Sequence, residues 1–167
     1  MEYQIAFSPG PACKQRIIST LREANTILNI CVFTISDDFI KDAIKAAFDR
    51  GVEVRIITDN YKVSDEGSDI EELSLHGIPV RVDESENHMH HKFMVADDEI
   101  TITGSYNWSN KANTNYENVI VTKDNTELAE QFIGEFNKIR DHYYPDKKDS
   151  EKNLNLNQLI RRLEILK

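Results

Sequence analysis

The stretch of residues 87–110 reads NHMHHKFMVADDEITITGSYNWSN, and it carries most of what the sequence says about the fold. Runs rich in apolar and β-branched residues predict strands over 88–96 and 100–103, and the acidic turn at 97–99 predicts that they form a hairpin. Three of the chain's five histidines lie within four positions at the start of the first strand. A pH switch, a metal site, a phosphate site and chance all remain open at this point.

Outside the hairpin, strand patterns alternate with helix patterns. The other predicted strands are 4–7, 27–35, 52–58, 79–82 and 119–122. The predicted helices follow Pro11 and cover 36–51, with Ser36 as the N-cap, 70–76 and 125–144. Repeated strand–helix order is typical of parallel strands covered by helices. We therefore predict an α/β fold with a mixed, mainly parallel sheet flanked by helices.

The chain has 167 residues, 40% of them hydrophobic, which suits one domain with a real core. We predict that this domain covers residues 1–145. Residues 146–167 begin as a charged linker and end in a leucine-rich stripe, which predicts a C-terminal amphipathic helix. That helix is expected to cover an apolar patch on its own domain or on a dimer mate, with partner binding as the alternative.

Composition also limits the location and the partners. No apolar run approaches the ~20 residues that span a membrane, and the first residues do not read as a secretory signal. Cys13 and Cys31 are not at a zinc-ligand spacing, so we expect reduced thiols in a cytoplasmic protein, or a periplasmic one if a signal was removed. The net charge of −9 argues against broad attraction to polyanions, so any polyanion site must be a local pocket.

The histidine cluster has the chemistry of an anion site. On a strand, His90 and Lys92 would point the same way, ~6.5–7 Å apart. A neutral imidazole beside an ammonium suits a phosphate. Ser105 and Asn107 follow the partner strand and supply neutral donors, and Gly104 would let the backbone approach a ligand. A phosphodiester needs this set: a nucleophile, a cation for the non-bridging oxygens, and donors that stabilise the developing charge.

At these residues the chain resembles a known family. His90-x-Lys92-x-x-x-x-Asp97, followed by Gly104-Ser105-x-Asn107, is similar to the HxKxxxxD…GSxN motif of the phospholipase D superfamily. The stretch NTNYENV around Glu117 makes the bacterial single-motif endonucleases of that superfamily the most similar group. The likeness spans roughly residues 5–143, so it implies the α/β sandwich of that superfamily.

The resemblance also implies a role for each matching residue. His90 would be the nucleophile and form a covalent phosphohistidine. Lys92 and Asn107 would hold phosphate oxygens, with help from Ser105. Glu117 would orient His90 through the other ring nitrogen, by the logic of a serine-protease triad.

Two further residues complete the predicted site. Asp97 belongs to the motif, and we expect it to be mainly structural, ordering the hairpin turn and the lysine. Lys111 is expected to help bind the substrate beside the Lys92 pair of a dimer.

Two displacements need one histidine deprotonated and another protonated, and the chain carries the motif once. We therefore predict a homodimer whose two-fold axis brings both copies of His90 together. No metal or cofactor is expected. The predicted activity is that of a metal-independent nuclease cutting DNA or RNA, with single strands favoured and no stable membrane association. The alternatives are a phospholipase acting on cardiolipin-like lipids and a catalytically idle phosphate- or nucleic-acid-binding module.

Several simpler interpretations stay open. His88 and His91 read more readily as surface residues than as functional ones. A metal site on His88, His90 and Asp97 is a rival, since H-x-H is a common ligand spacing, but the charge of Lys92 opposes it. We expect Trp108 to pack under the site, with base stacking as the alternative. The loop with Tyr61 and Lys62 either shapes substrate entry or only connects two elements.

Overall fold

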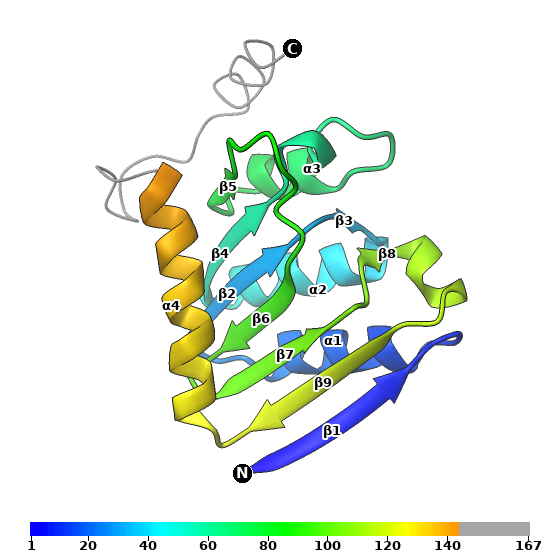
Figure 1. Ribbon diagram of the computed structural model, residues 1–167, viewed down its shortest axis with the longest axis vertical. Helices are drawn as coiled ribbons and strands as arrows, with labels where there is room; N and C mark the ends of the chain where they lie inside the picture. Colours follow the sequence, from blue (N-terminus) through cyan, green and yellow to red (C-terminus); the bar gives the residue numbers. More distant parts are fainter. Residues whose placement is uncertain (144–167) are drawn as a thin grey trace.

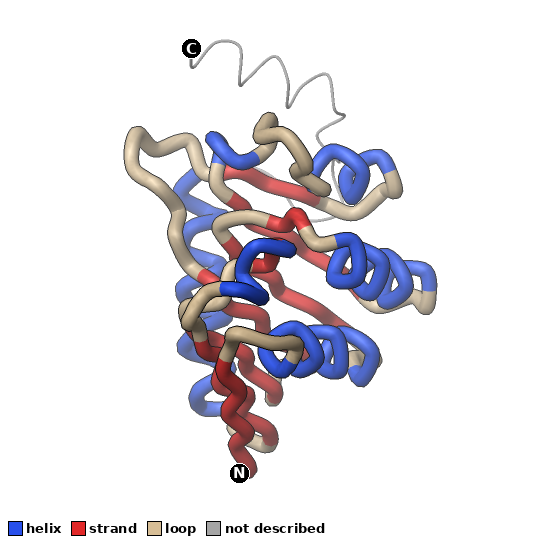
Figure 2. Tube along the Cα trace, turned by 90° about the vertical axis from the view of Figure 1, so that its right-hand side faces the viewer, coloured by secondary structure: helices blue, strands red, loops and turns tan. Residues whose placement is uncertain are grey.

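The computed structural model describes residues 1–143, so the predicted linker and terminal helix over 146–167 lie outside the described part. The described chain forms a seven-stranded sheet with helices on both faces (Figures 1 and 2). The strands of this sheet are β1 (Glu2–Phe7), β2 (Ile27–Val32), β4 (Glu53–Thr58), β5 (Val80–Val82), β6 (Lys92–Ala96), β7 (Ile100–Gly104) and β9 (Asn118–Lys123). The α-helices are α1 (Ala12–Glu23), α2 (Asp38–Asp49), α3 (Ile70–Leu75) and α4 (Thr126–Tyr143).

The strand order is β1-β9-β7-β6-β2-β4-β5, and the pairing is mixed, as predicted. The sheet is not mainly parallel, however: only β2–β4 and β4–β5 pair in parallel, and the other four pairs are antiparallel. The reason is the connections. The helices α2 and α3 carry the chain back to start a new strand in the same direction, whereas the β6–β7 turn reverses it. A second small sheet pairs β3 (Ile35–Ser36) with β8 (Trp108–Ser109).

The two faces of the sheet bury different cores. The larger core lies between the sheet and the helices α1 and α2, and it takes alternate residues of β2 such as Leu28 and Ile30. The smaller core lies under α4, where Phe136 packs with Cys31 and Phe93. Every residue of β6 is buried and so are all but the first of β2, as expected for central strands covered on both sides. No helix within residues 1–143 combines the length and the apolar character needed to cross a bilayer.

The start of α2 lies one residue later than predicted. Asp37 rather than Ser36 is the N-cap, and its Oδ1 accepts hydrogen bonds from the backbone N–H groups of Phe39 and Ile40. Its other oxygen binds Lys14 Nζ at 2.9 Å, which ties α1 to the start of α2. A capping carboxylate also suits the positive end of the helix dipole. Gly51 follows α2 with φ of 91°, as the predicted C-terminal glycine requires.

The first strand of the hairpin is shorter than predicted. β6 begins at Lys92, so the three clustered histidines precede the strand. The segment is still tied to the sheet, because the backbone N–H of Phe33 donates to the carbonyl of His91 at 2.8 Å. The two short 3₁₀ helices η1 (Asn60–Lys62) and η2 (Asn110–Thr114) lie in the loops that flank this region.

Candidate active site

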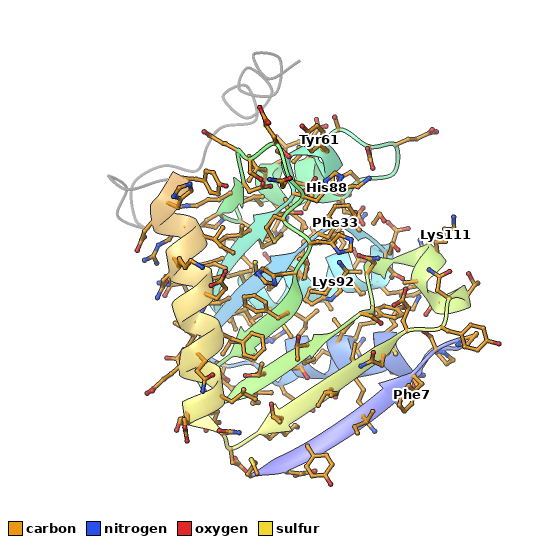
Figure 3. All side chains as sticks on the ribbon, in the orientation of Figure 1. Phe7, Phe33, Tyr61, His88, Lys92 and Lys111 are labelled. Atoms are coloured by element: carbon orange, nitrogen blue, oxygen red, sulfur yellow. The ribbon has the colours of Figure 1, made fainter. Side chains whose placement is uncertain are left out.

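The candidate site lies in the middle of the sheet, at the strand ends where β2 finishes and β6 begins (Figure 3). Val32, the last residue of β2, pairs with Lys92, the first residue of β6. The motif histidine therefore sits directly beyond the paired region, next to the half-buried ring of Phe33. The centroids of the Phe33 and His90 rings are 4.5 Å apart, with the planes tilted by 59°.

Lys92 is buried, and two contacts hold its ammonium group in position. Its Nζ donates to the carbonyl oxygen of His90 at 2.6 Å and lies 5.2 Å from the centroid of the Phe33 ring. Burial lowers the pKa of Lys92 to about 8, against the opposing effect of the negative charge of Glu117. An ammonium in such a place is poorly hydrated, so it gains from any anion that reaches it.

His90 is exposed, in contrast to the lysine. Partial desolvation lowers the pKa of His90, and the positive charges of Lys92 and His88 lower it further, while Asp59 acts in the opposite direction. The imidazole is therefore neutral near pH 7, the form that a nucleophile needs. Its ring makes no hydrogen bond to any residue between 1 and 143.

Glu117 lies near the lysine rather than on the histidine ring. Its backbone is held on both sides by Ser8, since the Glu117 N–H donates to Ser8 Oγ and the Glu117 carbonyl accepts from the Ser8 N–H. Its carboxylate accepts a long hydrogen bond of 3.5 Å from Asn115 and acts electrostatically on Lys92. Within one protomer, the predicted orientation of His90 by Glu117 is not formed.

The glycine and serine of the second motif have structural partners. A Cβ on Gly104 would lie 2.1 Å from the carbonyl oxygen of Asn118, so the close approach that requires glycine is to β9 and not to a ligand. Ser105 Oγ accepts from the Asn118 N–H and donates to Asn118 Oδ1 at 3.3 Å. Asn107 differs: its buried Oδ1 has no hydrogen-bond partner among residues 1–143, so its amide is not fixed there by an internal contact.

Asp97 is remote from the other motif residues, because the five residues of β6 place it ~17 Å from the start of that strand. Its carboxylate accepts hydrogen bonds from the backbone N–H groups of Asn25, Thr26 and Ile27, and from the Thr26 hydroxyl. It therefore fixes the β6–β7 turn to the start of β2, which is the structural role that we predicted for Asp97. It does not order the lysine, and it cannot share a metal with His88 and His90.

Lys111 is exposed on η2 and lines a surface groove together with the carboxylates of Asp38, Glu66 and Asp69. Those acidic neighbours make it a poorer phosphate ligand than its charge suggests. Trp108 is buried, as predicted. It lies in the short strand β8. His91 points to the opposite face of the sheet, with its Nε2 3.6 Å from Glu135 of α4.

The sequence prediction missed two residues at the site, Phe33 and Asp59. Each directly follows one of the adjacent parallel strands β2 and β4, and ligands usually bind at the carboxyl ends of such strands. That rule could have identified both. Asp59 is fully buried and its Oδ2 lies 3.1 Å from Nδ1 of His88, so His88 is held in place rather than being a chance surface residue.

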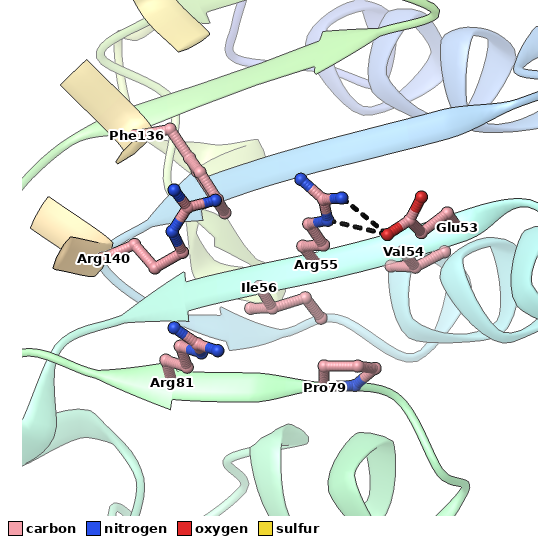
Figure 4. A pocket seen from close by; sticks show the side chains of 8 residues that line it. All are labelled: Glu53, Val54, Arg55, Ile56, Pro79, Arg81, Phe136 and Arg140. Atoms are coloured by element: carbon pink, nitrogen blue, oxygen red, sulfur yellow. Dashed lines mark hydrogen bonds and ion pairs between the residues drawn. The ribbon is translucent and has the colours of Figure 1, made fainter. Parts of the chain in front are cut away.

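A second polar pocket lies under α4 at the β4–β5 edge (Figure 4). Three arginines from three elements line it: Arg55, Arg81 and Arg140. Glu53 pairs with Arg55 at 2.6 Å, and Asp141 pairs with Arg140 at 2.7 Å. These carboxylates reduce the positive charge of the pocket, and none of its lining residues belongs to the predicted active site.

Comparison with known proteins agrees with the motif. The model of a family described as "Cardiolipin synthase, PLD-like domain" matches residues 17–140. The chain belongs to the phospholipase D superfamily. The predicted family and the predicted α/β sandwich are thereby confirmed.

Curated members of the phospholipase D superfamily resemble the chain over most of its length. A mitochondrial cardiolipin hydrolase of Chlamydomonas reinhardtii is 41% identical over 138 residues, which are 82% of this chain and 61% of that protein. The mitochondrial cardiolipin hydrolase of Homo sapiens is 37% identical over 139 residues, 83% of this chain and 55% of that protein. The chain thus spans a little over half the length of these relatives.

A solved phospholipase D structure has the same fold. The crystal structure of Nuc from Salmonella typhimurium, a phospholipase D family member, superimposes with a TM-score of 0.79 at 27% identity. The match covers 83% of this chain and 93% of that one. The fold described here is therefore that of a phospholipase D domain.

Proposed function

We propose that the chain is a phosphodiesterase that acts through His90. The observation that carries the proposal is the pairing of an exposed imidazole of lowered pKa with a buried ammonium, Lys92, whose Nζ lies 2.6 Å from the His90 carbonyl. A neutral nucleophile and a poorly solvated cation are what a phosphodiester needs at one point. Because Lys92 supplies the positive charge, we propose that no metal takes part.

In the proposed reaction, a nitrogen of the His90 ring attacks phosphorus and a phosphohistidine forms as the P–O bond to the leaving group breaks. Lys92 and Asn107 hold the non-bridging oxygens. The leaving oxygen takes a proton from a second imidazole, which then accepts a proton from water as that water attacks the phosphohistidine. The second attack restores both histidines.

The second imidazole is proposed to be His90 of another copy, since the motif occurs once in the chain. In a single protomer His90 lies open at the surface, and a two-fold axis beside it would turn two half-sites into one cleft. Because Glu117 acts electrostatically on Lys92, its carboxylate would then lie close to the cleft that the two copies form.

Exposed apolar residues on β1, an edge strand of the sheet, and on its neighbour β9 support the dimer. Tyr3, Ile5 and Phe7 of β1 are 68%, 48% and 68% exposed, and they point away from the core that Ala6 joins. Ile5 pairs with Ile120 of β9, which is also exposed. We call these four residues the β1 face.

The β1 face ends at the active-site rim, because Phe7 pairs with Asn118, the partner of Ser105. Two aromatic side chains supply up to about 150–250 Å² each, so the β1 face could form the centre of the ~800 Å² that a stable interface needs from each partner. We propose that a second copy of the chain covers it.

Nucleic acid is the proposed substrate, and a cardiolipin-like lipid is the second candidate. The lipid candidate is favoured by the names of the curated relatives. The net charge of the chain argues against the lipid. The β1 face could touch a bilayer through its apolar residues, but the chain carries a net charge of −9, and an anionic bilayer would repel it. A nucleic-acid strand needs only the local cations of the site.

One experiment compares wild type and His90→Asn on labelled single-stranded DNA, on RNA and on cardiolipin vesicles, all in EDTA. Loss of the nucleophile should lower the rate by about 10² or more on whichever substrate is cut. Near-normal turnover by His90→Asn would contradict the proposal, and so would wild-type activity that appears only when EDTA is left out and a divalent metal is added. A wild type that binds these substrates but cuts none would favour the idle module.

A further inference from the structure

A row of rings runs from the proposed nucleophile to the loop after β4. The Phe33 ring lies 4.5 Å from the His90 ring on one side and 5.4 Å from the His88 ring on the other. The His88 ring is in turn 5.4 Å from that of Tyr61. In Figure 3, Tyr61, His88, Phe33 and Lys92 follow one another across the same face. The row therefore joins the scissile position to the loop after β4.

One buried carboxylate fixes the outer part of this row. Asp59 Oδ1 accepts from the backbone N–H of Tyr61 at 3.0 Å, and Oδ2 accepts from the backbone N–H of Met89 at 3.0 Å. The same Oδ2 lies 3.1 Å from His88 Nδ1. Asp59 is fully buried, so these bonds are shielded from water. They fix the backbone at Tyr61 and Met89 and the ring of His88, and so place Tyr61 and His88 beside each other.

The outer rings are nevertheless open to a ligand. The His88 side chain is 56% exposed and Tyr61 is 51% exposed. The rings meet edge to face, with an interplanar angle of 77°, so the edge of one ring approaches one face of the other and the remaining ring faces are not covered by this contact. Lys62 places its Nζ 5.1 Å from the centroid of the Phe33 ring and pairs with Asp65 at 2.6 Å, so its positive charge is partly neutralised. The subsite therefore offers exposed rings more than positive charge, and exposed aromatic rings are what stack the bases of single strands.

We propose that Tyr61 and His88 form a stacking subsite for the base next to the scissile phosphate. The inference rests on the proposed phosphodiesterase function and adds the residues that select a nucleic acid. The acyl chains and glycerol of a phospholipid have no planar ring to stack. Stacking also does not depend on net charge, so it gives affinity in a chain whose formal charge is −9.

The test uses two single-stranded DNA oligonucleotides that differ at one position. One carries a base at every position, and the other has an abasic residue next to a single cleavable phosphate, with the remaining linkages blocked as phosphorothioates. The wild type should cut the complete oligonucleotide with the lower KM. Tyr61→Ala should raise that KM about 5- to 150-fold, the range expected for loss of one stacked base, and leave kcat nearly unchanged. It should not change the KM for the abasic oligonucleotide.

Tyr61→Phe is the matched control, because it keeps the ring and should keep the wild-type KM. His88→Ala should act like Tyr61→Ala. Asp59→Asn tests the positioning role, and it should raise KM for the complete oligonucleotide alone. Tyr61 is on the surface, so its substitution should leave the thermal unfolding temperature unchanged. The test therefore remains valid even if Asp59→Asn, at a buried position, fails to fold.

The outcomes separate this inference from the proposed function. If Tyr61→Ala leaves KM for the complete oligonucleotide unchanged, the stacking subsite is wrong although cleavage through His90 stands. An equal rise in KM for cardiolipin vesicles would also overturn it, since a lipid has no base to lose. If the wild type cuts nothing, fluorescence anisotropy of the two oligonucleotides on the His90→Asn variant measures the subsite by binding alone. Equal Kd values for the complete and abasic strands would then refute it.

Discussion

At the scale of single residues, the site depends on two groups, His90 and Lys92, whose pKa values are both lowered, so that each favours its neutral form more than it would in water. Lys92 is buried and loses part of its preference for the charged form, whereas His90 is kept neutral by desolvation and by that same lysine. An anion arriving at the site would reverse the first effect, since a negative charge favours the ammonium. On the proposed function, Lys92 would thus bind a phosphate that His90 then attacks.

The pH dependence of kcat/KM follows from these shifts. In the proposed dimer, activity should rise as the attacking His90 loses its proton, below the usual value of 6.5 because its pKa is lowered. It should fall as the second imidazole loses the proton that the leaving oxygen needs, and fall further as Lys92 loses its proton near a pKa of about 8. Lys92→Arg, which stays charged, should be slower but should lose the fall near pH 8. Rates on an oligonucleotide between pH 5 and pH 10 measure both limbs. A fall near pH 8 that Lys92→Arg leaves in place would assign it to another group.

Asp97 shows a motif residue whose role is stability. Burial opposes its ionisation, but hydrogen bonds from Thr26, Asn25 and Ile27 outweigh burial and hold the pKa of Asp97 below its usual value. Asp97→Ala should therefore lower the free energy of unfolding by about 2–3 kcal/mol at pH 7. Because the folded-state pKa is depressed, this difference should shrink as pH falls below about 4. Urea unfolding at pH 7 and pH 3 tests it, and an equal difference at both would contradict the assignment.

At the scale of elements, the sequence predicted most strands and helices but not how the strands pair. The period of apolar residues identifies buried segments such as β2 and β4, and Gly51 marks the end of α2. Pairing depends on contacts that are distant in sequence, such as β2 with β6, so a mainly parallel sheet was the wrong expectation. The predicted start of the hairpin strand at His88 was wrong, since β6 begins at Lys92. At His88 a contact that is distant in sequence again decides, because this residue bonds to Asp59 and not to a neighbouring strand.

The β7–β9 contact gives a prediction at this scale. Gly104→Ala should destabilise the fold by about 1–3 kcal/mol or more, because the new methyl group would meet the backbone oxygen of Asn118. Gly134→Ala is the control: it lies in α4 with open space around it, and should stabilise by about 0.5–1 kcal/mol. Thermal unfolding compares the two variants. A Gly104→Ala protein as stable as wild type would mean that the glycine serves a ligand after all.

At the scale of the whole molecule, the question is how half-sites on single chains become one active site. The motif residues His90, Lys92 and Asn107 could be singled out from the sequence, because the motif spacing puts Lys92 at the start of β6 and Asn107 shortly after the end of its partner strand β7. Glu117 could not be placed correctly, because its contacts come from Ser8 on the distant strand β1. The β1 face was also not predicted, since alternating apolar residues on a strand look the same whether a helix or a second chain covers them.

The assembly can be tested through that face. Phe7→Asp should weaken the proposed homodimer, because a carboxylate from each copy would be buried at the interface. Light scattering should then give the mass of one 19.3 kDa chain, and nuclease activity should fall in parallel. Leu75→Asp, on an equally exposed apolar residue of α3, should leave the dimer intact. Dimers unaffected by Phe7→Asp would place the interface elsewhere.

The central claim is that His90 becomes covalently bonded to phosphorus. Wild-type protein mixed with an oligonucleotide and quenched in alkali within the first turnover should yield, on peptide mass spectrometry, a peptide of residues around 90 whose His90 is bonded to a phosphate that still carries the retained fragment of the oligonucleotide. The adduct should disappear in the His90→Asn variant. Turnover at a normal rate with no adduct on His90 at any quench time, or with the adduct on His88 or His91, would contradict the account.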